Sequence, residues 1–131
     1  MDWVVTLHSY FRWVVLLIGV AAIVISLLAA SGNRPWDTAA ERLAFFFTLA
    51  MDIQFLIGVV VWVSEAKWAG DVVLGWLHPL AMLGAVALAH IGRARADRST
   101  LTRDKGRQAA LFFVVSFVVI LIAIPIGSWP V

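Results

Sequence analysis

The chain of 131 residues contains no cysteine, and only 14% of its residues are Asp, Glu, Lys or Arg. Without cysteine, the chain cannot form disulfides, thiolate metal sites, covalent c-type haem attachments or cysteine nucleophiles. The shortage of charge, against about 25% in an average soluble domain, excludes an ordinary water-soluble globule. The sequence also lacks a glycine-rich phosphate cradle, a metalloprotease motif and a nucleophile–base pair, so no catalytic residue is predicted.

Apolar residues make up 63% of the chain and gather in four stretches, 4–30, 43–63, 72–91 and 109–126. A helix needs about 20 such residues to cross the hydrocarbon core of a bilayer, and each stretch is long enough. The first stretch is too long, and its N-terminal flank too poor in Lys and Arg, for a cleaved signal peptide. The sequence therefore predicts an all-α, polytopic membrane protein in which residues 1–131 form one transmembrane domain in contact with the lipid bilayer.

Basic residues between the stretches are unevenly distributed. The connections 31–42 and 92–108 hold eight Lys and Arg residues, whereas the connection 64–71 holds only Lys67. The positive-inside rule then predicts cytoplasmic loops at 31–42 and 92–108 and both termini outside. Basic residues in such a protein report orientation, so the net charge of +2 does not predict binding to nucleic acid. The basic run 92–108 is interpreted as an orientation signal or a site for anionic lipid headgroups.

Short connections favour antiparallel neighbours, which predicts a four-transmembrane-helix, up-down-up-down bundle with the first and third helices parallel and diagonal to each other. Ionisable side chains inside a span cost about 2.5–3.5 kcal/mol at a helix centre, so each one is a functional hypothesis. The polar residues within the predicted spans are His8, Arg12, Asp52, Gln54, His78 and His90.

His8 and His78 lie at nearly the same predicted depth, roughly 6 Å and 9 Å below the outer boundary at the rise of an α-helix. On parallel helices across one core, two imidazoles can bind an object between them, which is the geometry of bis-histidine haem ligation. The alternative for each is an interfacial or capping residue. Met82 follows His78 by one helical turn and is either a further axial ligand or a core side chain.

Arg12 shares a helix face with His8 and is interpreted as a partner for a haem propionate or as an ion-pair partner of Asp52. Gln54 projects from nearly the opposite side of its helix to Asp52, so it can contact the first or the third helix. A metal site of two histidines and one carboxylate, formed by His8, His78 and Asp52, is a further alternative that the greater depth of Asp52 disfavours.

His90 lies twelve residues after His78, which turns it about 120° away from the face of His78. No other histidine lies at its level, so a second haem is not predicted and His90 is interpreted as an interfacial residue beside the basic run.

The segments LHSYFRW (7–13), DIQFLIG (52–58), LHPLAM (77–82), AHIGR (89–93) and ILIAIPIGSW (120–129) together resemble a family of small four-helix bacterial membrane proteins described as cytochrome b-like. The resemblance implies a b-type haem protein of the cytoplasmic membrane, with His8 and His78 matching the histidines of the first and third helices and Arg12 matching the arginine of the first motif. This chain departs from the family at Asp52, where the family pattern has a histidine before the Ile-Gln pair.

The hypothesis from the sequence is therefore a membrane electron-transfer protein or oxidoreductase that binds one haem b between His8 and His78. Its expected partners are a quinone or a redox protein, within an oligomer or a larger complex. Two rival functions belong to other classes: a non-enzymatic membrane subunit or assembly factor without a cofactor, and a small transporter that uses Asp52 as its carrier group.

Overall fold

The computed structural model describes residues 2–124, which form four long helices and two short helical segments. The elements, in chain order, are α1 (Asp2–Ala30), α2 (Thr38–Ser64), the 3-10 turn η1 (Lys67–Ala69), the π-helical turn η2 (Val73–Leu77), α3 (His78–Arg98) and α4 (Thr102–Ala123). The turn η2 runs directly into α3. All four long helices are long and apolar enough to cross a membrane, η2 and α3 as one span from Val73 to Arg98.

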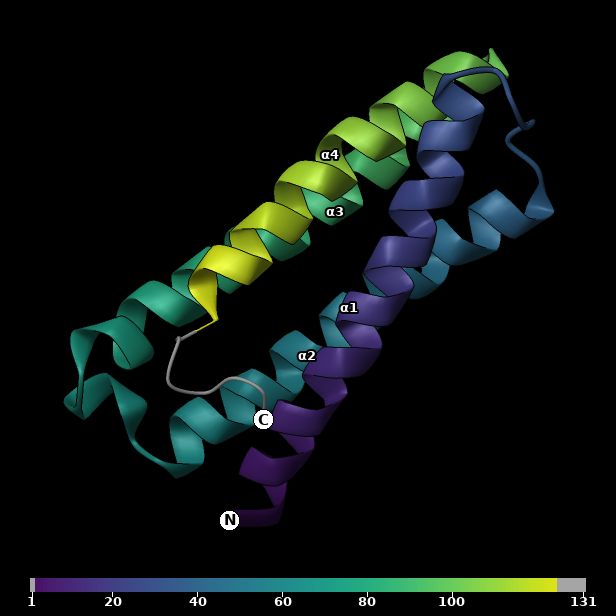
Figure 1. Cartoon of the computed structure of the whole chain (residues 1–131). Helices are drawn as coiled ribbons and strands as arrows, with labels where there is room; N and C mark the ends of the chain where they lie inside the picture. Colours follow the sequence, from purple (N-terminus) through teal and green to yellow (C-terminus); the bar gives the residue numbers. More distant parts are fainter. Residues whose placement is uncertain (1, 125–131) are drawn as a thin grey trace.

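The helices form an antiparallel bundle, so the predicted all-α four-helix fold is confirmed. Each helix packs against its neighbours in the chain and α1 also packs against α4, which leaves α1 and α3 diagonal to each other. In Figure 1 the hairpin of α1 and α2 lies beside the hairpin of α3 and α4, and the two diverge toward the end where the N-terminus lies. We call this the terminal end and the opposite end, which carries the loops 31–37 and 99–101, the basic end.

Small residues bring the helices together at the basic end. A Cβ on Gly106 of α4 would collide with the backbone of Ala29 and Ala30 of α1, and a Cβ on Gly92 of α3 would lie 2.5 Å from the Cβ of Phe112. Large side chains such as Leu17 and Ile122 instead point outward and are 71% and 78% exposed. This arrangement suits a lipid environment, where close van der Waals contact rather than exclusion of water drives helix association.

The helix ends differ from those expected at the connections. The predicted loop 92–108 is almost wholly helical, because α3 continues to Arg98 and α4 begins at Thr102. Likewise, α2 begins at Thr38 rather than at residue 43. Apolar stretches alone therefore predict helices that are too short at the basic end of the bundle, since basic side chains favour helix formation and extend readily toward headgroups.

The first turn of α2 is capped by Asp37, whose carboxylate accepts a hydrogen bond of 3.0 Å from the backbone N–H of Ala40. That hydrogen bond, together with an ion pair of 3.0 Å to Arg34, holds the pKa of Asp37 below its ordinary value. At the other end of the bundle, α4 ends at Ala123 and Ile124 is extended, as expected for the residue that precedes a proline in the sequence. Residues 125 and 126 of the predicted fourth stretch lie outside the described residues.

Candidate functional site

The structure brings His8 of α1 and His78 of α3 together across the core. Their ring centroids are 6.4 Å apart and their ring planes are nearly perpendicular, at 89°. An ion about 2.0 Å from one nitrogen of each imidazole would hold two opposed rings with centroids about 6 Å apart. The spacing of the two rings is therefore compatible with a shared metal ion.

A cavity of about 430 Å³ surrounds the two histidines and receives side chains from all four helices. Its size falls within the roughly 300–1,000 Å³ typical of small-molecule and cofactor sites. Three other residues from the sequence prediction line the same cavity, namely Arg12, Gln54 and Met82. Most of the remaining lining is aliphatic or aromatic, including Val15, Met51, Phe55, Leu83, Val86 and Ile120.

His78 is positioned by the irregular start of its helix. The turn η2 closes with a π-type hydrogen bond from the backbone N–H of His78 to the carbonyl of Val73, and such π-turns occur frequently at functional sites. The ring Nδ1 of His78 lies 2.8 Å from the carbonyl oxygen of Ala123, one of the last carbonyls of α4, which have no partner within their own helix. With Nδ1–H donating to this carbonyl, Nε2 retains its lone pair and is the atom available to bind a metal.

His8 is held on the opposite wall of the cavity by α2. The side-chain Nε2 of Gln54 donates a hydrogen bond of 2.8 Å to the backbone carbonyl of His8. Of the two helices that Gln54 was predicted to contact, the first and the third, it therefore contacts the first, α1. Gly58 lies beside the imidazole ring, where a Cβ would be only 3.1 Å from the Cε1 atom of His8. The ring nitrogen Nδ1 of His8 is buried and has no hydrogen-bond partner among residues 2–124.

A cluster of tryptophans covers the terminal end of the cavity. Pro79 has no N–H to donate to the carbonyl of Gly75 four residues earlier, and the indole Nε1–H of Trp62 donates to that carbonyl instead, at 2.6 Å. The ring of Trp62 also contacts those of Trp68 and Trp76, with centroids 5.1 Å and 5.6 Å away. Tryptophan is common at membrane–water interfaces, and here Trp62 and Trp76 also form part of the cavity wall.

Among the lining residues that were not predicted from the sequence, three have a specific contact or a charge at the site. Gly58 makes room for the His8 ring, Trp62 lines the cavity and braces η2, and Lys67 adds a second cation to the lining besides Arg12. The segment DIQFLIG contains Gly58, but only the tertiary contact identifies its role. The role of Trp62 had a sign in the sequence. In the segment 75–79, Gly-x-x-x-Pro, the proline has no N–H, so the carbonyl of Gly75 needs another donor.

Asp52 and His90 lie outside this cavity and contact each other. The Nε2 of His90 is 2.7 Å from Oδ1 of Asp52, so the side chain that contacts the Asp52 carboxylate among residues 2–124 is that of His90 rather than that of Arg12. Within the same residues, no group of three or more His, Cys, Asp or Glu side chains can hold a metal ion. This excludes the alternative site of His8, His78 and Asp52. His90, which is interpreted from the sequence as an interfacial residue, forms a side-chain pair with Asp52.

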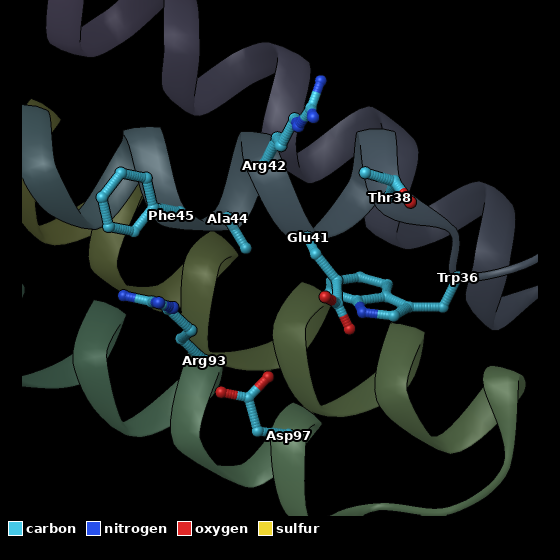
Figure 2. A pocket seen from close by; sticks show the side chains of 8 residues that line it. All are labelled: Trp36, Thr38, Glu41, Arg42, Ala44, Phe45, Arg93 and Asp97. Atoms are coloured by element: carbon cyan, nitrogen blue, oxygen red, sulfur yellow. The ribbon is translucent and has the colours of Figure 1, made fainter.

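A second cavity of about 360 Å³ opens between α2 and α3 at the basic end. Figure 2 shows Glu41 of α2 and Asp97 of α3 directing their carboxylates into it beside the ring of Trp36, while the side chain of Arg42 points away. The guanidinium of Arg93 turns toward the ring of Phe45, 5.0 Å from its centroid. This cavity mixes charges of both signs, in contrast to the largely apolar cavity around His8 and His78.

Comparison of the chain with protein-family models, with curated proteins and with solved structures found no match.

Proposed function

We propose that the protein is a b-type cytochrome of the membrane, that it holds one haem between His8 and His78, and that it acts in electron transfer. The observation that carries the proposal is the pair of imidazoles, 6.4 Å apart, in a largely apolar cavity to which all four helices contribute. Bundle cores are common places for cofactor sites built from facing helices. The resemblance of the sequence to cytochrome b-like membrane proteins adds independent support.

The residues present fit such a group. The donor set is two neutral imidazoles, a usual axial pair for b-type iron, and the hydrogen bond from His78 to the carbonyl of Ala123 would fix the tautomer and orientation of one of them. The buried Nδ1 of His8, without a partner among residues 2–124, indicates that the His8 side of the cavity is suited to a polar or metal partner. When bound, a b-type haem supplies a one-electron carrier whose potential depends on its axial ligands, its hydrogen bonds and its burial.

The other lining residues have separate tasks in this proposal. Arg12 and Lys67 line the cavity from α1 and η1, and as cations they would pair with propionate carboxylates. Gln54 fixes the backbone at His8, and the tryptophans at the terminal end exclude water from the imidazoles. Met82 lines the cavity one turn after His78 and serves as an apolar wall when both histidines ligate.

We further propose that the chain lies in the bacterial cytoplasmic membrane with its basic end in the cytoplasm and both termini outside. The eight Lys and Arg residues in the predicted connections at the basic end, against Lys67 alone between α2 and α3, support this orientation. Under it, the histidine pair lies nearer the outer face. Electron exchange would then involve a lipid-soluble quinone or a redox protein on that side.

The test is a reduced-minus-oxidised visible spectrum of the detergent-purified protein, with a pyridine haemochrome assay to count haem. We expect a low-spin b-type spectrum at about one haem per chain, and we expect His8→Ala and His78→Ala each to lower bound haem at least tenfold. His90→Ala is the matched control because His90 lies outside the cavity, and it should retain haem. A protein that stays colourless when haem is supplied, or equal retention in all three variants, would refute the proposal and favour a cofactor-free membrane subunit.

A further inference from the structure

The facing sides of α2 and α3 carry a row of residues, all polar except Phe45, that do not line the histidine cavity. On α2 the row consists of Glu41, Phe45, Thr48 and Asp52, and on α3 it consists of His90, Arg93 and Asp97. Spacings of three and four residues place each set on one face of its helix. We call these seven residues the α2–α3 seam, which leads from the basic end to the middle of α2.

The inner terminus of the seam is the Asp52–His90 pair. Asp52 lies about 21 Å along α2 from its first residue at the rise of an α-helix, well inside a hydrocarbon core about 30 Å thick. The two side chains are joined at 2.7 Å and remain 41% and 44% exposed. Ionisable groups at such a depth are costly and usually functional.

The charge of this pair makes it a site for a proton. If Nε2–H of His90 donates to the Asp52 carboxylate, the pair carries a net charge of −1. Binding of one proton at Nδ1 of His90 converts the pair to an imidazolium and a carboxylate with no net charge, which is the less costly state in a low-dielectric surrounding. The proton comes from a hydronium ion, whose O–H bond breaks to leave a water molecule, and the N–H bond at Nδ1 of His90 is the bond that forms.

The rest of the seam supplies access for that proton from the basic end. The cavity of Figure 2 receives the carboxylates of Glu41 and Asp97, which raise the local concentration of positive ions. Between this cavity and the pair, Nη1 of Arg93 donates to Oγ1 of Thr48 at 3.3 Å. That bond and the contact with the ring of Phe45 fix the position of the guanidinium within the seam.

The charged groups that line this route lie on α2 and α3, and Lys105 of α4 lies beside it, with its Nζ donating to the backbone carbonyls of Ala96 and Asp97 at 3.0 Å and 3.5 Å. Those on α2 are Glu41, Arg42 and Asp52, and those on α3 are His90, Arg93 and Asp97; within residues 2–124, α1 and α4 contribute no lining residue to the cavity at the basic end. At the entry, the carboxylates of Glu41 and Asp97 share the cavity lining with the guanidinium groups of Arg42 and Arg93. The carboxylates of Glu41 and Asp97 are the groups at this entry that can accept a proton from water.

We propose that the α2–α3 seam is a proton-exchange path between water at the basic end and a proton-binding site formed by Asp52 and His90. This function is separate from the haem proposal and does not depend on it. It gives Asp52, where the resemblance expects a histidine, a role of its own.

The test is time-resolved infrared spectroscopy of the protein in lipid nanodiscs after a flash releases a caged proton. The wild-type chain should give a signal of imidazolium formation, with a shift of the carboxylate band, that is missing from both Asp52→Asn and His90→Gln. Asp52→Glu, which keeps the carboxylate, should restore it. Folding of each variant is checked by circular dichroism, and the two independent deletions and the rescue keep the test valid if one variant fails to fold.

Access is tested with paired substitutions at the two ends of the bundle. Glu41→Gln with Asp97→Asn should slow the rise of the signal about tenfold, whereas the control, Glu65→Gln with Asp71→Asn at the terminal end, should leave it unchanged. Absence of the signal in the wild type, or equal slowing by both double variants, would overturn the proposal. A further outcome would also overturn it: native mass spectrometry shows that Asp52→Asn converts a dimer to a monomer, and no protonation signal is seen. Asp52 and His90 would then serve contact between two copies of the chain.

Discussion

The contact between Gly58 and His8 allows a quantitative test of the histidine site. A Cβ placed on Gly58 would lie 3.1 Å from Cε1 of His8, and ordinary contact begins at 3.4 Å, so Gly58→Ala must displace the ring by about 0.3 Å. Metal–ligand distances tolerate deviations of only about 0.2 Å. The alanine should therefore lower haem affinity about tenfold, which is the lower end of the loss typical for residues that orient a metal ligand.

Gly84→Ala is the matched control for this substitution. Gly84 lies in the interior of α3, and a Cβ there would meet nothing within 4 Å. Both substitutions gain up to about 1 kcal/mol of helix propensity, so they differ mainly in the contact with His8. Haem titration in detergent, followed by visible absorbance, should show weakened binding for Gly58→Ala and unchanged binding for Gly84→Ala. Equal affinities for the two variants would refute the argument that Gly58 provides space for a ligating imidazole.

The remaining predictions concern stability. The Ser116 hydroxyl donates a buried hydrogen bond of 2.7 Å to the carbonyl of Ala85, between α4 and α3. Ser116→Ala should therefore lower the free energy of unfolding by about 0.6 kcal/mol and at most about 1.7 kcal/mol, measured by titration with a denaturing detergent. A larger loss would show that the substitution removes more than this one hydrogen bond. Because Ala40 and Arg34 lower the pKa of folded Asp37, the stabilisation is present above the unfolded pKa of about 3.9 and is lost as pH falls through the lower folded value. Asp37→Asn keeps a capping side chain but cannot titrate. Acidification below pH ~4 should therefore lower the melting temperature of the wild type more than that of the variant. If the melting temperatures of both proteins fall equally with pH, Asp37 is not the group responsible.

The sequence was sufficient to predict the four helices and their antiparallel order, because the length of an apolar stretch and the cost of burying charge in lipid are local properties. It also predicted that His8 and His78 meet, since helix rise converts residue number into depth. It did not predict the ends of α3 and α4, where charged residues continue the helix.

The partners of the polar residues depended on tertiary structure. Asp52 is at a depth compatible with Arg12 as well as with His90, and only the rotation of α2 about its axis directs its carboxylate to His90. The same rotation sends Gln54 to the backbone of His8. Packing fixes helix rotation, and packing depends on small contacts such as those of Gly92 and Gly106, which involve residues far apart in the chain. Sequence alone therefore determined which polar groups enter the membrane and at what depth, and the tertiary structure decided which of them meet, because depth follows from residue number whereas direction follows from helix packing.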